Sequence, residues 1–331
     1  MAMGRAREAK GVKIDWQQME KTSSKGRLIL GLGEVLWDVL PEGPRLGGAP
    51  ANFAVMASRL GNHVALLSRV GWDDLGKQAL DRLESLPVDA SLVQIDSRHE
   101  TGRVTVSFED GQPQYTIHQP AAWDSLELTE DWVRIASRAD AVCFGSLAQR
   151  GLESRQTIQT LVAQTPPACV RVFDVNLRKP FYTSEVVEES IELATVIKMN
   201  EVEVPLVLEL LGLPIEHDPL LGDPLRLGAR SLLGEFPSLK IVAITRGDRG
   251  SLLVTRKESD DHPGIPTRVV DTVGAGDAFT AALTHYLLLG ADLATVNEAG
   301  NRWGSWVASQ AGSMPDLTDE VRAAITSAIS R

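Results

Sequence analysis

Short apolar runs alternate with longer amphipathic stretches along most of the chain, starting at Arg27. The strand-like runs RLILGL and HVALLSRVG are followed by stretches of helical period, ANFAVMASRLG and LGKQALDRLESL. The same alternation returns in ADAVCFGSL, CVRVFDVN, VVEESIELATVIKMN and KIVAITRG. Strands that alternate with helices predict an α/β fold with a central, mostly parallel β-sheet flanked by helices.

The pattern changes between residues 101 and 120, where the chain reads TGRVTVSFEDGQPQYTIHQP. Two runs of alternating polar and apolar residues flank a turn that contains Asp-Gly, which is typical of a β-hairpin. A hairpin inside an α/β chain predicts a small, separate β-sheet.

The first residues and the composition exclude several classes of protein. Residues 1–26 are polar and contain no apolar run of signal-peptide length, so we expect a loose tail before a domain at 27–331. No stretch approaches the roughly 18 apolar residues of a membrane helix. The chain has 33 basic and 44 acidic side chains, and a net charge of −11 disfavours nucleic acid and anionic lipid as partners. Cys143 and Cys169 lack metal-site spacing, and we expect reduced thiols in the cytoplasm.

The most informative string is VVDTVGAGDAFTAALTHYLLLG, at residues 269–290. Gly274, Ala275 and Gly276 follow a short strand and precede a helix, so their N–H groups can form a backbone cradle for an anion. Asp277 lies where the cradle meets the helix, and a carboxylate there can accept the proton of an attacking hydroxyl. The alternative is a glycine-rich turn with an N-capping aspartate.

A second string, RLGGAPANFAVMASRLG, covers residues 45–61. Gly47 and Gly48 lead through Pro50 into an amphipathic helix, and Asn52 near its first turn can offer an amide to a polyhydroxylated ligand. Taken alone, the string is equally well explained by a plain helix start.

Together, the two strings resemble the paired signatures of the PfkB/ribokinase family of sugar kinases, in the same order and with a similar separation of a little over 200 residues. The resemblance extends from about Arg27 to Leu317. Three further strings, GEVLWDVLPEGPRLGGAPANFA, YTIHQPAAWD and FGSLAQR, are similar to bacterial fructokinases. The resemblance implies a ribokinase-like fold with a small β-sheet lid, which we expect at about residues 41–46 and 101–120.

The resemblance also implies roles for residues on the sugar side. Asp277 corresponds to the catalytic base, and the backbone of the Gly-Ala-Gly turn corresponds to the anion hole. Asp38 matches the acidic residue that binds sugar hydroxyls, together with Gly48 and Asn52. Arg178 can neutralise a phosphate or contact the sugar from the end of a strand, and the alternative is a structural salt bridge.

On the nucleotide side, Asn200 and Glu203 match the family's N-x-x-E motif, which organises Mg²⁺ and phosphate through water. Thr245, Gly247 and Gly250 match a T-x-G-x-x-G segment that borders the nucleotide. We therefore expect ATP and Mg²⁺ as cofactors.

Asp271 and Val273 match positions whose oxygens bind K⁺ in some relatives. Against a K⁺ site, Gly312 stands only three residues before Pro315, which is shorter than the family spacing.

The sequence thus predicts ATP-dependent phosphorylation of a sugar hydroxyl, with fructose as the first candidate. The alternatives are a kinase for another small polyol, such as 2-keto-3-deoxygluconate, ribose or a nucleoside, and a catalytically inactive sugar-binding regulator. Relatives often dimerise through the lid, so the resemblance also implies a homodimer.

Overall fold

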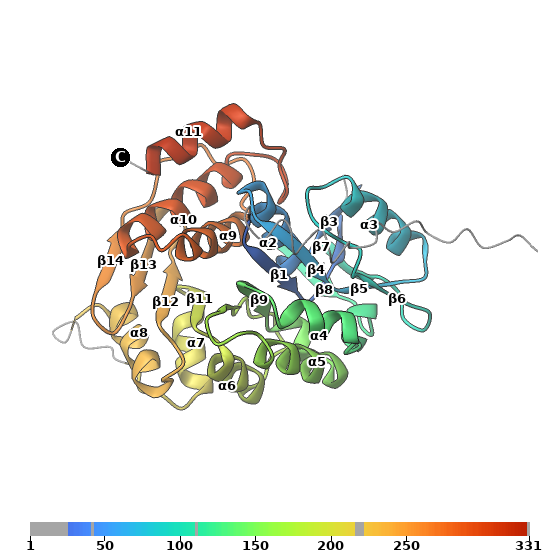
Figure 1. The fold of residues 1–331 in the computed structure, drawn as a ribbon, viewed down its shortest axis with the longest axis horizontal. Helices are drawn as coiled ribbons and strands as arrows, with labels where there is room; N and C mark the ends of the chain where they lie inside the picture. The colour runs from blue at the N-terminus through green and yellow to red at the C-terminus, as the bar shows by residue number, and fades with distance from the viewer. Residues whose placement is uncertain (1–25, 41–42, 110–111, 216–221, 330–331) are drawn as a thin grey trace, which may run out of the picture.

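The computed structural model describes residues 26–40, 43–109, 112–215 and 222–329. Within them, the core of the molecule is an eight-stranded sheet in the order β14-β13-β12-β11-β10-β9-β1-β4 (Figure 1). The expected tail lies outside the described residues except for Gly26, and so do residues 41–42 and the Asp-Gly turn at 110–111.

Six neighbouring strands of this sheet, β4, β1, β9, β10, β11 and β12, pair in parallel. This confirms the expected mostly parallel sheet. Their bounds are β1 Leu28–Leu32, β4 His63–Leu67, β9 Ala141–Gly145, β10 Val170–Asp174, β11 Val196–Asn200 and β12 Ile241–Thr245. The edge strands β13 (Ser251–Val254) and β14 (Ser259–His262) are antiparallel. They reverse direction because the loops before them are too short for a crossover.

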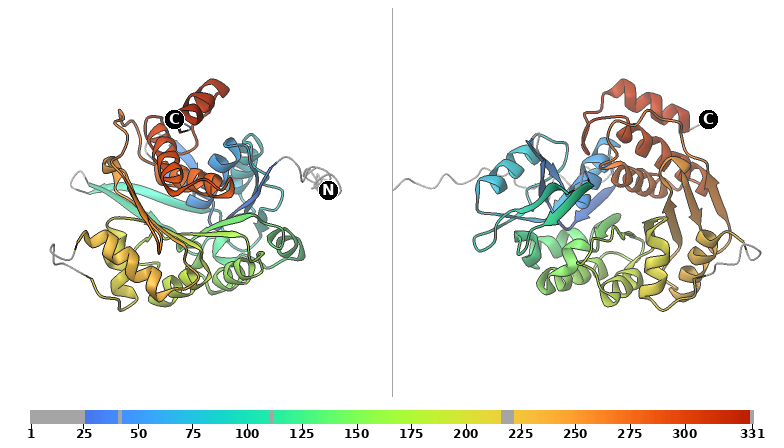
Figure 2. Two further views of the ribbon diagram at one scale, coloured as in Figure 1. Left: turned by 60° about the vertical axis from the view of Figure 1, so that its left-hand side comes forward. Right: turned by 180° about the vertical axis from the view of Figure 1, so that it is seen from behind.

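Helices cover both faces of the sheet and enclose two hydrophobic cores. One face carries α2 (Ala49–Arg59), α9 (Ala275–Leu288) and α10 (Leu293–Ala308), with α11 (Asp319–Ile329) packed on α10. The other face carries α4 (Glu130–Ala136), α5 (Leu152–Ala163), α6 (Ser184–Leu193), α7 (Glu203–Leu210) and α8 (Pro224–Glu235). Figures 1 and 2 show these two helical layers above and below the sheet. None of the helices in the described part of the chain has the length and apolarity to cross a membrane.

A small four-stranded sheet lies at one end of the molecule, in the order β3-β2-β7-β8 (Figure 2). It contains β2 (Leu36–Leu40), β3 (Gly43–Gly47), β7 (Gly102–Glu109) and β8 (Gln112–Ile117). The expected small sheet is therefore present, and the hairpin strands β7 and β8 are antiparallel. A short pair, β5 (Arg69–Gly71) and β6 (Gln94–Asp96), and helix α3 (Asp74–Glu84) lie beside it.

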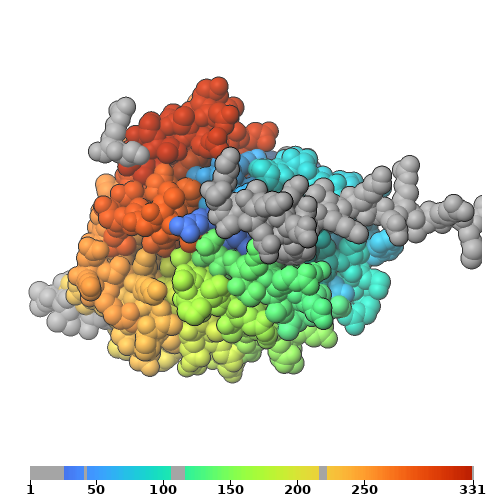
Figure 3. Space-filling view, in the orientation of Figure 1, coloured from blue at the N-terminus to red at the C-terminus, as the bar shows by residue number. Residues whose placement is uncertain are grey.

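The parallel strands share one carboxyl edge, where ligand sites of open α/β sheets are found. The N-termini of α2 and α9 contact each other. A hydrogen bond from Thr280 on α9 to Asp174 at the end of β10 places this contact at the carboxyl edge. In the space-filling view, the C-terminal helices cover the upper part of the molecule and the α4–α7 layer covers the lower part (Figure 3).

Candidate active site

Helices α2 and α9 both start after a glycine with a left-handed backbone. Gly48 has φ 105° and Gly274 has φ 79°. A Cβ atom on Gly48 would lie 2.4 Å from the carbonyl oxygen of Glu34, and one on Gly274 would lie 2.6 Å from Cβ of Ser313. Only glycine fits at both positions. Because Gly274 has no side chain to cap the first turn of α9, the N–H groups of that turn are suited to bind a ligand. In α2, Pro50 has no N–H and the N–H of Ala49 donates to the carboxylate of Glu34.

The two helix starts are joined by a direct contact between their polar side chains. Nδ2 of Asn52 donates a hydrogen bond of 2.7 Å to Oδ2 of Asp277, across 225 residues of sequence. The pKa of Asp277 is raised to about 6, mainly by burial and then by the negative charge of Asp174. Lys198, the Asn52 amide and Arg178 oppose this rise. A carboxylate with this pKa is a competent proton acceptor near neutral pH.

Asp38 lies on the central strand β2 of the small sheet, beside the Gly47-Gly48 turn. A Cβ atom on Gly47 would lie 2.7 Å from Oδ2 of Asp38, so the glycine leaves room for the carboxylate. Burial raises the pKa of Asp38, and the charge of Arg178 opposes the rise. Arg178 is exposed after β10 and also acts electrostatically on Asp277. The expected sugar-side residues therefore face a common region at the carboxyl edge.

Asn200 and Glu203 lie at the end of β11 and the start of α7. The two carboxylate oxygens of Glu203 accept 2.8 Å hydrogen bonds from the N–H groups of Leu177 and Asn200. The side chain of Asn200 accepts from the N–H groups of Val202 and Glu203. Burial raises the pKa of Glu203, while the bond from Asn200 opposes the rise. The motif thus ties the loop after β10 to the end of β11 and the start of α7.

The other residues expected on the nucleotide side lie around the end of β12. Thr245 is the neighbour of Asn200 in the parallel register. Gly247 and Gly250 have φ 62° and 75°, and a Cβ atom on Gly250 would lie 2.2 Å from the backbone nitrogen of Gly264. This group follows β12, which is two strands from β10 in the sheet.

Asp271 and Val273 lie in the loop that leads into α9. Oδ1 of Asp271 accepts the N–H of Val273 at 3.0 Å, and Oδ2 accepts the N–H of Gly312 at 3.1 Å. Nη1 of Arg45, on β3, reaches the same oxygen at 3.3 Å. Asp271 therefore holds two loops together and connects them to the small sheet.

The backbone cradle differs in one respect from the expectation that all its N–H groups point outward. The N–H of Ala275 donates a 3.2 Å bond to the carbonyl of Thr272. The left-handed conformation of Gly274 closes a tight turn, which brings these two groups together.

Three residues near Asp277 were not identified from the sequence: Glu34, Lys198 and Thr280. Glu34 is 3% exposed and follows β1, and burial raises its pKa to about 7. Lys198 forms a buried ion pair with Asp174. The sequence does contain a signal for two of them. Lys198 lies inside the apolar run VIKMN, and Glu34 follows a buried strand. A charge in such a place needs a partner or a function.

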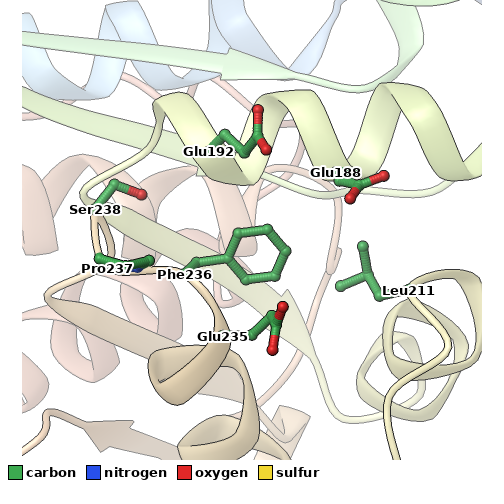
Figure 4. Close-up of a pocket in the computed structure, with 7 residues that line it drawn as sticks. All are labelled: Glu188, Glu192, Leu211, Glu235, Phe236, Pro237 and Ser238. Carbon is green, nitrogen blue, oxygen red and sulfur yellow. The ribbon is translucent and has the colours of Figure 1, made fainter.

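A separate cavity of about 270 Å³ lies away from this edge (Figure 4). Three glutamates and the ring of Phe236 line it, and none of the expected site residues does. Its lining residues are Glu188, Glu192, Leu211, Glu235, Phe236, Pro237 and Ser238.

Comparison with known proteins supports the kinase interpretation. The family model "pfkB family carbohydrate kinase" matches residues 43–320. The chain belongs to this family. An uncharacterized sugar kinase of Pyrococcus horikoshii is 32% identical over 77% of this chain and 81% of its own length. A fructokinase of Salmonella typhimurium is 29% identical over 76% of this chain and 81% of its own length.

Solved structures show the same fold. The P. horikoshii kinase superposes with a TM-score of 0.74 at 30% identity, over 87% of this chain and 93% of that one. A structure of that kinase in complex with ATP gives 0.72. A Vibrio cholerae fructokinase gives 0.74 at 23% identity, over 91% and 98% of the two chains, which supports the fold alone. The protein is thus an ATP-dependent carbohydrate kinase with a ribokinase-like fold.

Proposed function

We propose that this kinase transfers the γ-phosphoryl group of ATP to a hydroxyl of fructose, with Asp277 as general base. The observation that carries the proposal is the 2.7 Å bond between Asn52 and Asp277. It joins the two helix starts that carry the family's two signatures, so that a sugar bound at α2 lies beside the carboxylate at α9. The raised pKa of Asp277 suits proton removal near neutral pH.

The residues divide the work as follows. Asp38, Gly48, Asn52 and Arg178 bind and orient the sugar. Asp277 accepts the proton of the attacking hydroxyl, and the backbone of the Gly-Ala-Gly turn stabilises the charge that develops on the transferred phosphoryl group. On binding the phosphoryl group, the N–H of Ala275 would exchange its long bond to Thr272 for the anion.

Asn200, Glu203, Thr245, Gly247 and Gly250 border the nucleotide. In the described part of the chain, no group of three or more His, Cys, Asp or Glu side chains is arranged to hold a metal. This fits Mg²⁺, which keeps several waters and binds mainly through substrate phosphates. When bound, Mg²⁺ neutralises phosphate charge, and Glu203 and Asn200 act on it through water.

A K⁺ role for Asp271 and Val273 is not part of this proposal, because the Asp271 carboxylate already accepts from three donors. The small sheet is proposed as a lid that excludes water from the phosphoryl group. Its outer strands, β3 and β8, each pair with one neighbour in the described sheet, and their outer edges are the proposed contacts of a homodimer. Cys143 and Cys169 are buried free thiols, which supports a cytoplasmic location.

We favour fructose as the substrate because several relatives aligned over most of the chain are named fructokinase or probable fructokinase. The chief alternative is a kinase for another small polyol. The aminoimidazole riboside kinase of Salmonella enterica has the same fold at 21% identity, so the fold itself does not select the sugar.

The test is a coupled ATPase assay of the wild type and Asp277→Asn with a panel of sugars. Wild-type turnover should depend on fructose and fall below about pH 6, where Asp277 becomes protonated. Asp277→Asn should lower kcat by roughly 10²–10⁴-fold because it removes the general base. Asp319→Asn, at the exposed start of α11, serves as the control and should leave kcat unchanged. A folded Asp277→Asn protein with normal turnover would contradict the assignment.

A further inference from the structure

A buried lysine lies directly beneath the first turn of α9. Lys198, on β11, is 7% exposed. Its Nζ atom lies 3.0 Å from the position that a Cβ atom on Gly276 would occupy. Gly276 immediately precedes Asp277, so the ammonium group is next to the turn that presents the catalytic carboxylate.

Asp174, at the end of β10, holds this lysine in place. Nζ of Lys198 and Oδ1 of Asp174 are 3.1 Å apart, and both side chains are buried. The other oxygen, Oδ2, accepts a 3.0 Å hydrogen bond from the hydroxyl of Thr280, one turn into α9. The pair therefore connects two neighbouring strands of the sheet to the helix that carries Asp277.

The location of the cation is electrostatically costly. The N-terminus of a helix carries a partial positive charge, which repels an ammonium group beneath it. A buried ion pair is also a poor device for stability, because apolar residues of similar volume often stabilise a core as well or better. Stability alone therefore does not explain why the pair is present.

The charges around Asp277 come from several elements: Lys198 on β11, Asp174 at the end of β10, Arg178 in the loop after β10 and Glu34 after β1. Asn52 on α2 contributes a neutral hydrogen bond, and Glu203 on α7 acts on Lys198. Lys198 retains its charge: burial works against it, but the neighbouring carboxylates keep its pKa above the ordinary value.

We propose that Lys198 and Asp174 are positioning residues that together set the basicity of Asp277. Lys198 favours the ionised carboxylate, which must be present before a proton can be accepted. Asp174 opposes this effect and keeps the carboxylate basic enough to take a hydroxyl proton. The inference rests on the proposed role of Asp277 as the general base.

The experiment compares the pH profiles of kcat/KM for the wild type, Lys198→Met, Asp174→Asn and the double variant. The acid limb of kcat/KM reports the free enzyme's base. Lys198→Met should move this limb to higher pH by about one unit, the lower end of the effect of a nearby opposite charge. Asp174→Asn should move it to lower pH, because it removes a negative charge. The double variant, which leaves no buried charge unpaired, should lie between the two.

Two controls separate this role from a structural one. Lys198→Arg keeps the charge and should keep the limb near its wild-type position. Arg155→Met breaks an ion pair with Glu189 between α5 and α6, on the other face of the sheet, and should not move the limb. If Lys198→Met does not fold, Asp174→Asn and the double variant still decide the question by circular dichroism and pH profile.

The inference is overturned if the folded variants lose rate equally at every pH while the acid limb stays in place. Failure of the proposed function looks different. In that case Asp277→Asn would itself retain turnover, and the acid limb would belong to another group.

Discussion

The starts of α2 and α9 at the active site differ from those of three helices elsewhere in the molecule, α4, α6 and α10. Helices α2 and α9 begin after Gly48 and Gly274, whose backbones are left-handed. By contrast, α4, α6 and α10 begin at Thr129, Thr183 and Asp292, whose side chains accept hydrogen bonds from the N–H groups of the first turn. In α4, α6 and α10 a side chain thus accepts from the first turn, while Gly48 and Gly274 provide no such acceptor at the site.

The absence of a side-chain cap lowers the stability of a helix start. A side-chain cap contributes about 1 kcal/mol to a helix, and an anion at the same place can provide a similar contribution while it is bound. At the start of α9, a bound anion would therefore supply what α4, α6 and α10 obtain from Thr or Asp. Mutation at either kind of start should lower stability, but only mutation at the α9 start should also lower kcat.

The largest effect among these tests is expected for Gly274→Ala. Its φ of 79° is unfavourable for alanine, and the new Cβ would lie 2.6 Å from Cβ of Ser313. We expect a loss of about 1–3 kcal/mol in stability from the strained backbone. We also expect kcat to fall by about 10²-fold or more, as when an anion-hole donor is displaced. Thermal unfolding and steady-state kinetics measure the two effects.

Gly290→Ala is the matched control, at the other end of the same helix. Gly290 has a similar φ of 74°, and a Cβ atom there would have no neighbour within 4 Å. It should lose stability but keep kcat. Equal losses of kcat in the two variants would mean that backbone strain, and not the cradle, explains the result.

Asp38→Ala tests whether the small sheet contributes to the sugar site. Removal of a charged hydroxyl acceptor should cost at least about 2 kcal/mol in kcat/KM for the sugar. The KM for ATP should stay close to that of the wild type, because Asp38 lies on β2, away from the end of β12. An unchanged kcat/KM for the sugar would remove Asp38 from the binding site.

Much of the fold followed from local patterns in the sequence. Each strand and helix can be recognised from its own periodicity. Strands that alternate with helices then predict a parallel sheet. The Gly-Ala-Gly-Asp turn was identified for a similar reason, since glycine marks a backbone that other residues rarely adopt. The string AITRGDRGSLLV reads as strand, glycine turn and strand, and β12 and β13 lie there as an antiparallel pair.

The interactions between distant segments were less accessible. Asn52 and Asp277 are each prominent in the sequence, but no local rule joins side chains 225 residues apart. Lys198 was missed because its function depends on burial beneath α9, which only the tertiary structure shows. Glu34 was missed for the same reason, since its burial and raised pKa depend on the tertiary structure.

Glu203→Gln should have a smaller and more specific effect. Both oxygens of Glu203 accept backbone N–H bonds, and an amide nitrogen cannot replace one of them. We expect a modest loss of stability and a higher Mg²⁺ concentration for half-maximal rate, because the hard cation or its waters prefer an anionic oxygen. A Mg²⁺ titration that overlays the wild-type curve, together with lower thermal stability, would show that the motif is only structural.

The smallest kinetic effect is expected at a capped helix, for Thr129→Ala. The side chain of Thr129 accepts a 3.3 Å bond from the N–H of Trp132 at the start of α4. Its loss should lower the free energy of unfolding by about 1 kcal/mol, which denaturant titration measures. Thr129→Ser keeps the hydroxyl and should recover most of the loss. Because α4 lies in the helical layer on the face opposite α2 and α9, kcat and both KM values should not change (Figure 1). A fall in kcat comparable with that of Gly274→Ala would contradict the distinction between capped helices and the glycine-started helices of the site.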